Sequence, residues 1–145
     1  MVLEQRVLIA VGEAGLRQQL HKALLRNDVY SDWATHAREA LERLSERTYG
    51  LLILDLQLAD DGFDAVLTRA AALPAGQRPM IIVTGERGPR PTLDSDLVQI
   101  ILYKPIDVRA LGELIANCLR TLADHTQRAR TRAAAPPRDE LDTRA

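Results

Sequence analysis

The sequence predicts an α/β domain built on a doubly wound parallel β-sheet. Short aliphatic runs recur along the chain with few polar residues inside them, which is typical of parallel strands covered on both faces. Segments of helical periodicity separate these runs, and a repeated strand–helix order requires right-handed crossovers that place helices on both faces of the sheet. The chain has 145 residues, of which 46% are hydrophobic, so one domain can bury a core of its own.

Five segments are expected to be strands. Four are aliphatic runs, and one, at residues 29–33, alternates apolar and polar side chains and is the weakest of the five. In chain order the expected strands are residues 7–11, 29–33, 51–54, 80–83 and 98–102.

Four further segments are expected to be helices, because their apolar residues recur every three or four positions and so share one face. These positions are Leu16, Leu20, Ala23 and Leu24; Ala37, Ala40, Leu41 and Leu44; Val66, Ala70 and Leu73; and Val108, Leu111, Ile115, Cys118 and Leu122. Pro74 and Gly76 are expected to end the third helix, since proline cannot continue a helix and glycine weakens one.

The interval between the fourth and fifth strands breaks this rhythm. Residues 85–97 contain two prolines and two glycines in their first half, which leaves room for about one helical turn at residues 92–96. We therefore expect a fourth helix that is degraded or missing.

The domain is expected to cover residues 1–125. Residues 126–145 are polar, rich in Ala and Arg, and contain Pro136-Pro137. We expect this segment to extend the last helix and then to end in a disordered tail from about residue 136.

Composition excludes several classes of protein. Nineteen basic and twenty acidic residues give a net charge of -1, which provides no overall attraction to nucleic acid or to an anionic membrane. The longest apolar runs are about five residues, far short of the roughly 20 that span a bilayer, and the N-terminus lacks a signal-peptide pattern. A single cysteine, Cys118, forms neither an internal disulfide nor a zinc motif. We expect a cytoplasmic protein without nucleic-acid or membrane partners.

Three chemically active side chains stand at the ends of expected strands. Asp55 follows the third strand, Thr84 the fourth and Lys104 the fifth. The carboxyl ends of parallel strands meet at one edge of a sheet, where functional groups of doubly wound folds collect. A carboxylate that attacks phosphorus, a hydroxyl that binds a phosphoryl oxygen and an ammonium that neutralises the added charge suit acyl-phosphate chemistry. Pro105 restricts the lysine to extended backbone geometry, which helps to aim its side chain.

At this point the chain resembles the receiver domain of two-component response regulators, the CheY-like family. Four motifs carry the resemblance, in order and at near-family spacing. They are residues 6–10 (RVLIA), 52–58 (LILDLQL) followed by 61–63 (DGF), 82–85 (IVTG) and 103–105 (YKP). The resemblance spans about residues 5–123. It implies a flavodoxin-like, five-stranded parallel sheet in the order 2-1-3-4-5, with Asp55 as phosphoacceptor, Thr84 as switch hydroxyl and Lys104 as the family's lysine.

The chain departs from the family in the acidic pair that holds Mg²⁺ after the first strand. Val11 and Gly12 stand at those two positions, and Glu13 follows one residue later. A carboxylate lost from about 4 Å of a divalent cation removes about 8 kcal/mol of gross attraction at an effective dielectric constant of about 20, part of which desolvation offsets. We expect Mg²⁺ binding to be weak or lost, with Asp55 and Glu13 as the candidate metal ligands, aided by Asp60 or Asp61. Glu13 is equally well explained as a first-turn residue of a helix.

The loop after Asp55 also lacks the usual proline, and Ile101 replaces the family's aromatic switch residue. Two functions therefore remain open. In the first, the chain is a single-domain response regulator that accepts a phosphoryl group on Asp55 and signals through protein–protein contacts. In the second, it is a pseudo-receiver, a constitutive interaction module that does not use phosphorylation.

The resemblance also implies partners. A histidine kinase or phosphotransfer protein would supply the phosphoryl group, and a downstream protein would receive the signal. We expect a monomer or a homodimer through the last helix. An enzyme is not expected, since the chain has no GxGxxG, P-loop or GxSxG motif.

Overall fold

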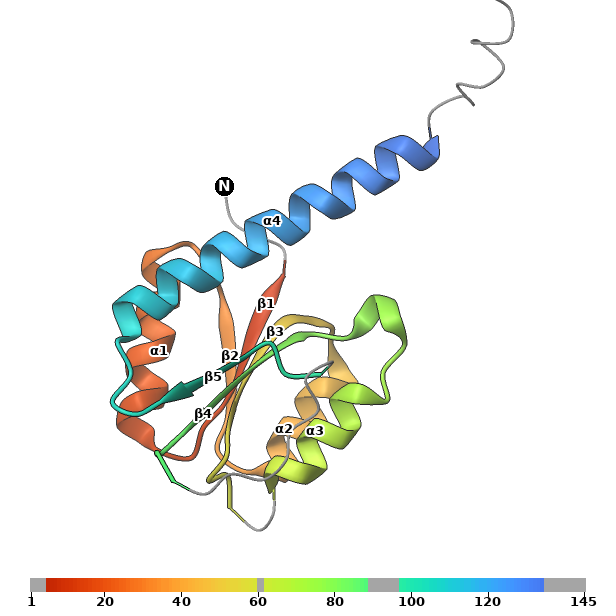
Figure 1. Ribbon diagram of the computed structural model, residues 1–145. Helices are drawn as coiled ribbons and strands as arrows, with labels where there is room; N and C mark the ends of the chain where they lie inside the picture. The colour runs from red at the N-terminus through yellow and green to blue at the C-terminus, as the bar shows by residue number, and fades with distance from the viewer. Residues whose placement is uncertain (1–4, 60–61, 89–96, 135–145) are drawn as a thin grey trace, which may run out of the picture.

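The computed structural model describes residues 5–59, 62–88 and 97–134, and the side chains up to residue 124. The described chain contains five strands, four α-helices and one short 3₁₀-helix, η1; strands and helices alternate from β1 to β4, and β5 and α4 follow (Figure 1). Their bounds are β1 (Arg6–Ala10), α1 (Ala14–Arg26), β2 (Ser31–Ala34), α2 (Ala37–Glu46), β3 (Tyr49–Asp55), α3 (Gly62–Ala71), η1 (Ala75–Gln77), β4 (Met80–Gly85), β5 (Ile100–Tyr103) and α4 (Val108–Ala134).

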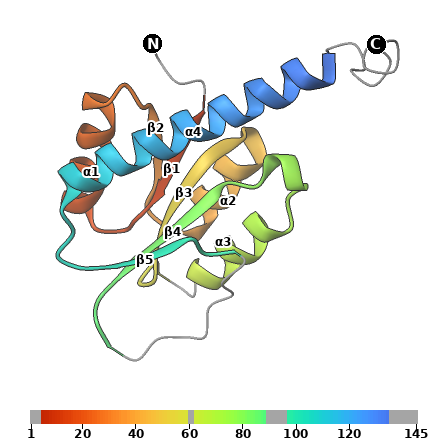
Figure 2. The ribbon, with the colours of Figure 1, turned by 45° about the horizontal axis from the view of Figure 1, so that its top comes forward.

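The strands form one parallel sheet in the order β2-β1-β3-β4-β5. Helices α1 and α4 cover one face, and α2 and α3 cover the other, as Figures 1 and 2 show from two directions. This arrangement confirms the predicted fold class, a doubly wound, flavodoxin-like sheet with strand order 2-1-3-4-5.

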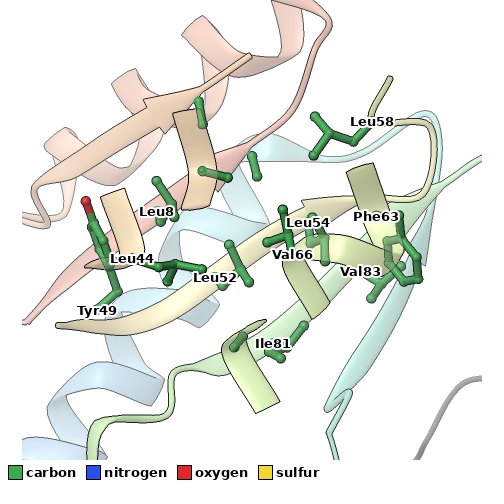
Figure 3. Packing of buried hydrophobic residues seen from close by; sticks show 14 of the residues in the cluster. Leu8, Leu44, Tyr49, Leu52, Leu54, Leu58, Phe63, Val66, Ile81 and Val83 are labelled. Atoms are coloured by element: carbon green, nitrogen blue, oxygen red, sulfur yellow. The ribbon is translucent and has the colours of Figure 1, made fainter. Parts of the chain in front are cut away.

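Side chains of the central strands alternate between two hydrophobic cores. Along β3, Leu51 and Ile53 pack against α1 and α4, whereas Leu52 and Leu54 pack against α2 and α3. Figure 3 shows this second core, with Leu52 and Leu54 of β3 beside Val66 of α3. Because both faces are covered, a continuous aliphatic run satisfies both cores, which is why these strands lack polar alternation.

Two strands begin later in the chain than the hydrophobic runs predict. Asp28 has a φ of 61°, and the Val29 N–H donates to the Leu24 carbonyl at 3.0 Å. Val29 therefore belongs to the turn that ends α1, and β2 starts at Ser31 instead of residue 29. The fifth strand likewise runs from Ile100 to Tyr103, two residues after the predicted start at residue 98.

The described parts of the fourth crossover, residues 86–88 and 97–99, contain no helix. Residues 89–96 lie outside the described residues, and so does the single turn predicted at 92–96. The predicted disorder of the tail from about residue 136 also lies outside them. Within the described ranges, no helix is both long enough and apolar enough to span a membrane.

Helices α1 and α4 approach each other closely at a glycine. A Cβ atom on Gly112 of α4 would lie 3.0 Å from the carbonyl oxygen of Ala23 in α1, which is tighter than ordinary contact. Leu111 and Ile115 flank this contact and are buried in the core under both helices. The glycine thus sets how closely α4 packs on the domain.

A polar cluster lies at the amino-terminal end of the sheet, around Asp32 of β2. The Tyr49 hydroxyl donates to Asp32 Oδ2 at 2.8 Å, and the guanidinium groups of Arg6 and Arg47 lie 3.5 and 3.7 Å from the same carboxylate. Burial, and then the hydrogen bond to the Asp32 carboxylate, raises the pKa of Tyr49 well above its usual range.

We predict that Tyr49→Phe lowers the free energy of unfolding by about 1 kcal/mol near neutral pH, because it removes this hydrogen bond. A pKa raised in the folded state stabilises the protein below the unfolded pKa of about 10, and this stabilisation is lost as the pH rises above it. The difference between wild type and Tyr49→Phe should therefore shrink above about pH 10. Urea unfolding at several pH values measures it.

Tyr30→Phe is the control for this measurement, since Tyr30 is an exposed tyrosine. It should change the free energy of unfolding at neutral pH by no more than about 0.5 kcal/mol. Equal effects of the two substitutions would contradict the role assigned to the Tyr49–Asp32 hydrogen bond.

Candidate functional site

The three predicted side chains stand at the carboxyl ends of neighbouring strands. Asp55 is the last residue of β3 and pairs in register with Thr84 of β4. Lys104 follows β5, and its N–H donates to the Gly85 carbonyl at 2.9 Å. Two positions before each of the three lies a residue of the core under α1 and α4, and the two-residue repeat of a strand directs the three side chains to that same side.

These side chains come together around one carboxylate oxygen. Lys104 Nζ lies 2.8 Å from Asp55 Oδ2, and the Thr84 hydroxyl donates to the same oxygen at 3.2 Å. The backbone N–H of Gln57 donates to the other oxygen, Asp55 Oδ1, at 2.8 Å. Asp55 is only 2% exposed, and burial of an unpaired carboxylate is costly, so these donors and the ammonium charge are what allow it to lie there.

Lys104 also faces a second carboxylate. Glu13 is the N-cap residue of α1, but its side chain makes no capping hydrogen bond. Instead, Glu13 Oε2 lies 3.7 Å from Lys104 Nζ, which also donates to the side-chain amide oxygen of Gln57 at 3.4 Å. Glu13 thus stands at the start of the helix, with its carboxylate directed at Lys104, and its role as a metal ligand stays a prediction.

The turn after β1 is closed by an arginine. Val11 is fully buried in the core under α1 and α4, whereas Gly12 is exposed. Arg17 Nη1 donates to the carbonyl oxygens of Val11 and Gly12, at 3.1 and 3.2 Å. The Trp33 ring lies against the same guanidinium, 5.4 Å from centroid to Cζ. The Arg17 side chain therefore holds this turn in place.

Sequence reasoning did not single out Arg17 or Gln57. The signal for Arg17 was a basic residue in the first turn of a helix, where the helix dipole favours acidic residues. Gln57 carried no signal beyond its place two residues after Asp55.

The donor set that the described residues provide does not fit a magnesium site. The two positions at which the family carries acidic residues are a buried valine and a glycine, and both candidate ligands, Asp55 and Glu13, lie against the Lys104 ammonium. No group of three or more acidic, histidine or cysteine side chains that could hold a metal occurs among the described residues. Asp60 and Asp61, the other candidates, lie outside those residues.

No protein-family model matches the chain, and no curated protein sequence matches it. Solved structures do. A CheY-like response regulator receiver domain from Methylobacillus flagellatus aligns with a TM-score of 0.68 and 22% identity, covering 78% of this chain and 97% of that one. A CheY-like receiver domain protein from Methanospirillum hungatei JF-1 aligns with a TM-score of 0.67 and 18% identity, covering 83% and 98%.

A third similar structure is the response regulator TrrA from Thermotoga maritima, in complex with Mg²⁺-BeF. Its TM-score is 0.61 at 23% identity, covering 78% of this chain and 97% of that one. At these identities the similarity shows the fold. The chain has the fold of a response regulator receiver domain, and its strand order and helix placement agree with that fold.

We predict that Lys104→Met lowers the free energy of unfolding by about 2 kcal/mol, because it leaves the buried Asp55 carboxylate without its cation. This value lies below the range for fully buried pairs, since the lysine side chain is 18% exposed. The double variant Asp55→Asn/Lys104→Met removes both charges and should recover part of the loss. Urea unfolding at neutral pH measures all three.

Lys22→Met is the matched control, because Lys22 is the chain's other lysine and lies exposed on α1. It should change the free energy of unfolding by less than about 0.5 kcal/mol. If Lys104→Met is as stable as this control, the ion pair does not support the buried carboxylate.

Proposed function

We propose that the chain is a single-domain response regulator of two-component phosphorelay signalling, with Asp55 as its phosphoacceptor. The observation that carries this proposal is the meeting of a hydroxyl and an ammonium on one oxygen of a buried carboxylate. A fold that only binds partners has little need for all three groups at one point. The similarity to receiver domains supports the same signalling role.

The proposed reaction is transfer of a phosphoryl group from a phosphohistidine of a histidine kinase or phosphotransfer protein. An oxygen of the Asp55 carboxylate attacks phosphorus, and the P–O bond forms as the P–N bond breaks. The electron pair of the broken bond stays on the imidazole nitrogen, which takes a proton from water. The product is an aspartyl phosphate, and the histidine is released unmodified.

Thr84 and Lys104 are proposed to respond to the new group. Phosphorylation adds negative charge beside the Lys104 ammonium, which is already within ion-pair distance of Asp55. The Thr84 hydroxyl, released from Asp55 Oδ2, can donate to a phosphoryl oxygen instead. The two residues would thus couple the charge on β3 to the positions of β4 and β5. In this proposal the chain is a switch and not an enzyme.

A pseudo-receiver is the second candidate. Two observations favour it: the positions of the acidic pair hold Val11 and Gly12, and Ile101, in place of an aromatic switch residue, packs into the core under α2 and α3. Such a module would bind its partner constitutively through the same fold.

Phosphorylation of the purified protein decides between the two candidates. We expect phosphoramidate or a phosphorylated phosphotransfer domain to add one phosphoryl group, seen as a mass increase of the intact protein that hydroxylamine reverses. The reaction is run with and without MgCl₂, and modification in either condition supports the proposal. Asp55→Asn should abolish it, whereas Asp64→Asn, at an exposed carboxylate of α3, should not. If wild-type protein stays unmodified with both donors, the phosphoacceptor proposal is contradicted and the pseudo-receiver remains as the candidate function.

Signalling is proposed to pass through protein contacts at β5 and α4. An apolar pocket of about 260 Å³ lies between the end of β5 and the start of α4, and Leu114 at its rim is 41% exposed. Its lining residues are Leu102, Tyr103, Pro105, Ile106, Asp107, Ala110, Leu111 and Leu114. Lys104 lies in the chain between two of these lining residues, Tyr103 and Pro105, and this adjacency supports a route from the phosphoacceptor to the surface. A downstream protein, or a second copy docked through α4, is the proposed partner.

We predict that the homodimer, if formed, depends on this surface. Where multi-angle light scattering shows a dimer for wild type at high concentration, Leu114→Lys should be a monomer, because a charge placed in an apolar interface is strongly disfavoured. Leu25→Lys on α1, where the leucine is similarly exposed, is the control and should leave the mass unchanged. A wild-type monomer at all concentrations would remove the dimer and leave the downstream protein as partner.

A further inference from the structure

One ammonium lies between two carboxylates at the end of the sheet. Lys104 Nζ is 2.8 Å from Asp55 Oδ2 and 3.7 Å from Glu13 Oε2. The two carboxylates come from different elements, the end of β3 and the N-cap of α1, and neither makes another ion pair among the described residues. Lys104 is therefore the cation that joins them.

The two carboxylates differ in their surroundings. Asp55 is buried and accepts hydrogen bonds from Thr84 and Gln57, so its position is fixed. Glu13 is mostly exposed, and its carboxylate makes no bond to the helix it begins. An N-cap carboxylate ordinarily accepts a hydrogen bond from a backbone N–H of the first turn. The longer Glu13 side chain instead lies toward Lys104, within ion-pair distance of the ammonium.

A divalent cation at this point would compete with Lys104 for the same two carboxylates. With Val11 buried and Gly12 lacking a side chain, the described residues supply no third carboxylate to offset the lysine charge. Two carboxylates and one ammonium leave a local charge of about -1, and displacement of the ammonium from Asp55 would cost its closest charge pair. The geometry thus favours the Lys104 ammonium over a divalent cation as the positive charge beside these two carboxylates.

We propose that Lys104 is the resident cation of this site and that it excludes divalent cations, with Glu13 as the residue that positions it. Asp55 holds the ammonium from the buried side and Glu13 holds it from the exposed side. The proposal concerns how the site is charged, and it stands whether or not Asp55 accepts a phosphoryl group.

A substitution at Gly12 can shift the competition between the Lys104 ammonium and a divalent cation toward the divalent cation. A Cβ atom at Gly12 would meet only the Thr35 carbonyl oxygen, at 3.5 Å, which is ordinary contact. Gly12 is also exposed, so an aspartate fits there without displacing the core, whereas Val11 is buried among apolar side chains. Gly12→Asp adds a third carboxylate while leaving Lys104 in place.

Magnesium titration followed by amide chemical shifts tests the exclusion. Wild type should show no saturable shift at Asp55 or Glu13 with millimolar MgCl₂. Lys104→Met and Gly12→Asp should each bind Mg²⁺ at least about tenfold more tightly than wild type, which corresponds to about 1.4 kcal/mol. The double variant Glu13→Gln/Lys104→Met should lose the gain, because only the Asp55 carboxylate is left.

Several outcomes would overturn the proposal. One is a saturable shift at Asp55 in wild type with the affinity of Gly12→Asp. Another is a Lys104→Met protein, shown to be folded by its spectrum, that gains no affinity. If Lys104→Met does not fold, Lys104→Gln, which keeps a polar group beside Asp55, takes its place, and a folded Lys104→Gln protein that gains no affinity also contradicts the proposal.

The positioning role of Glu13 has its own test. Lys22 and Lys104 are the only lysines of the chain, so acetylation by a limiting reagent, read by peptide mass spectrometry, compares a site lysine with an exposed internal reference. Glu13→Gln should raise the labelling of Lys104 relative to Lys22 about twofold, the effect of losing a partly exposed ion pair. Glu13→Asp should restore the wild-type ratio. An unchanged ratio in Glu13→Gln would contradict the role of Glu13.

Discussion

Because both faces of the sheet are buried, the positions that polar side chains can take along its central strands are restricted. Each residue of β3 between Leu51 and Leu54 packs into one of the two cores, so a charged side chain has no place until the strand ends. Asp55 is the first position at which the chain leaves the layered core, and β4 and β5 bring Thr84 and Lys104 to the same edge. The site is thus a consequence of the parallel arrangement: the buried middle of the central strands excludes polar groups, and the carboxyl ends of β3, β4 and β5 bring these three side chains to one edge.

The fold could be predicted from sequence because its strongest signals are physical requirements of that arrangement. Continuous aliphatic runs and helical stripes located the central strands and the four helices. The edges were harder to place. The start of β2 depends on the turn at Asp28, whose positive φ and the hydrogen bond from Val29 to Leu24 draw apolar residues into the end of α1. Hydrophobicity does not distinguish a residue packed in such a turn from one in a strand.

The site was predictable only in part, for a related reason. Asp55, Thr84 and Lys104 follow from strand ends and could be predicted together. The direction of the Glu13 carboxylate and the link from Arg17 to the turn after β1 could not, because each depends on where a long side chain goes once the backbone is folded. Both involve the turn at which this chain departs from the receiver pattern. At that turn, the Arg17 guanidinium contacts two backbone carbonyl oxygens, and the Lys104 ammonium lies near the Glu13 carboxylate.

The long helix α4 starts near this edge of the sheet and extends well beyond the domain core. It begins four residues after Lys104, crosses α1 where Gly112 meets Ala23, and continues beyond the sheet, as Figures 1 and 2 show. Its 27 residues span about 40 Å, and the crossing with α1 lies near one end of that length. A tilt of about 5° at that point displaces the far end by about 3 Å over such a length. The displacement from any change in the angle at which α4 leaves this edge would therefore be larger at its distal end than at its start.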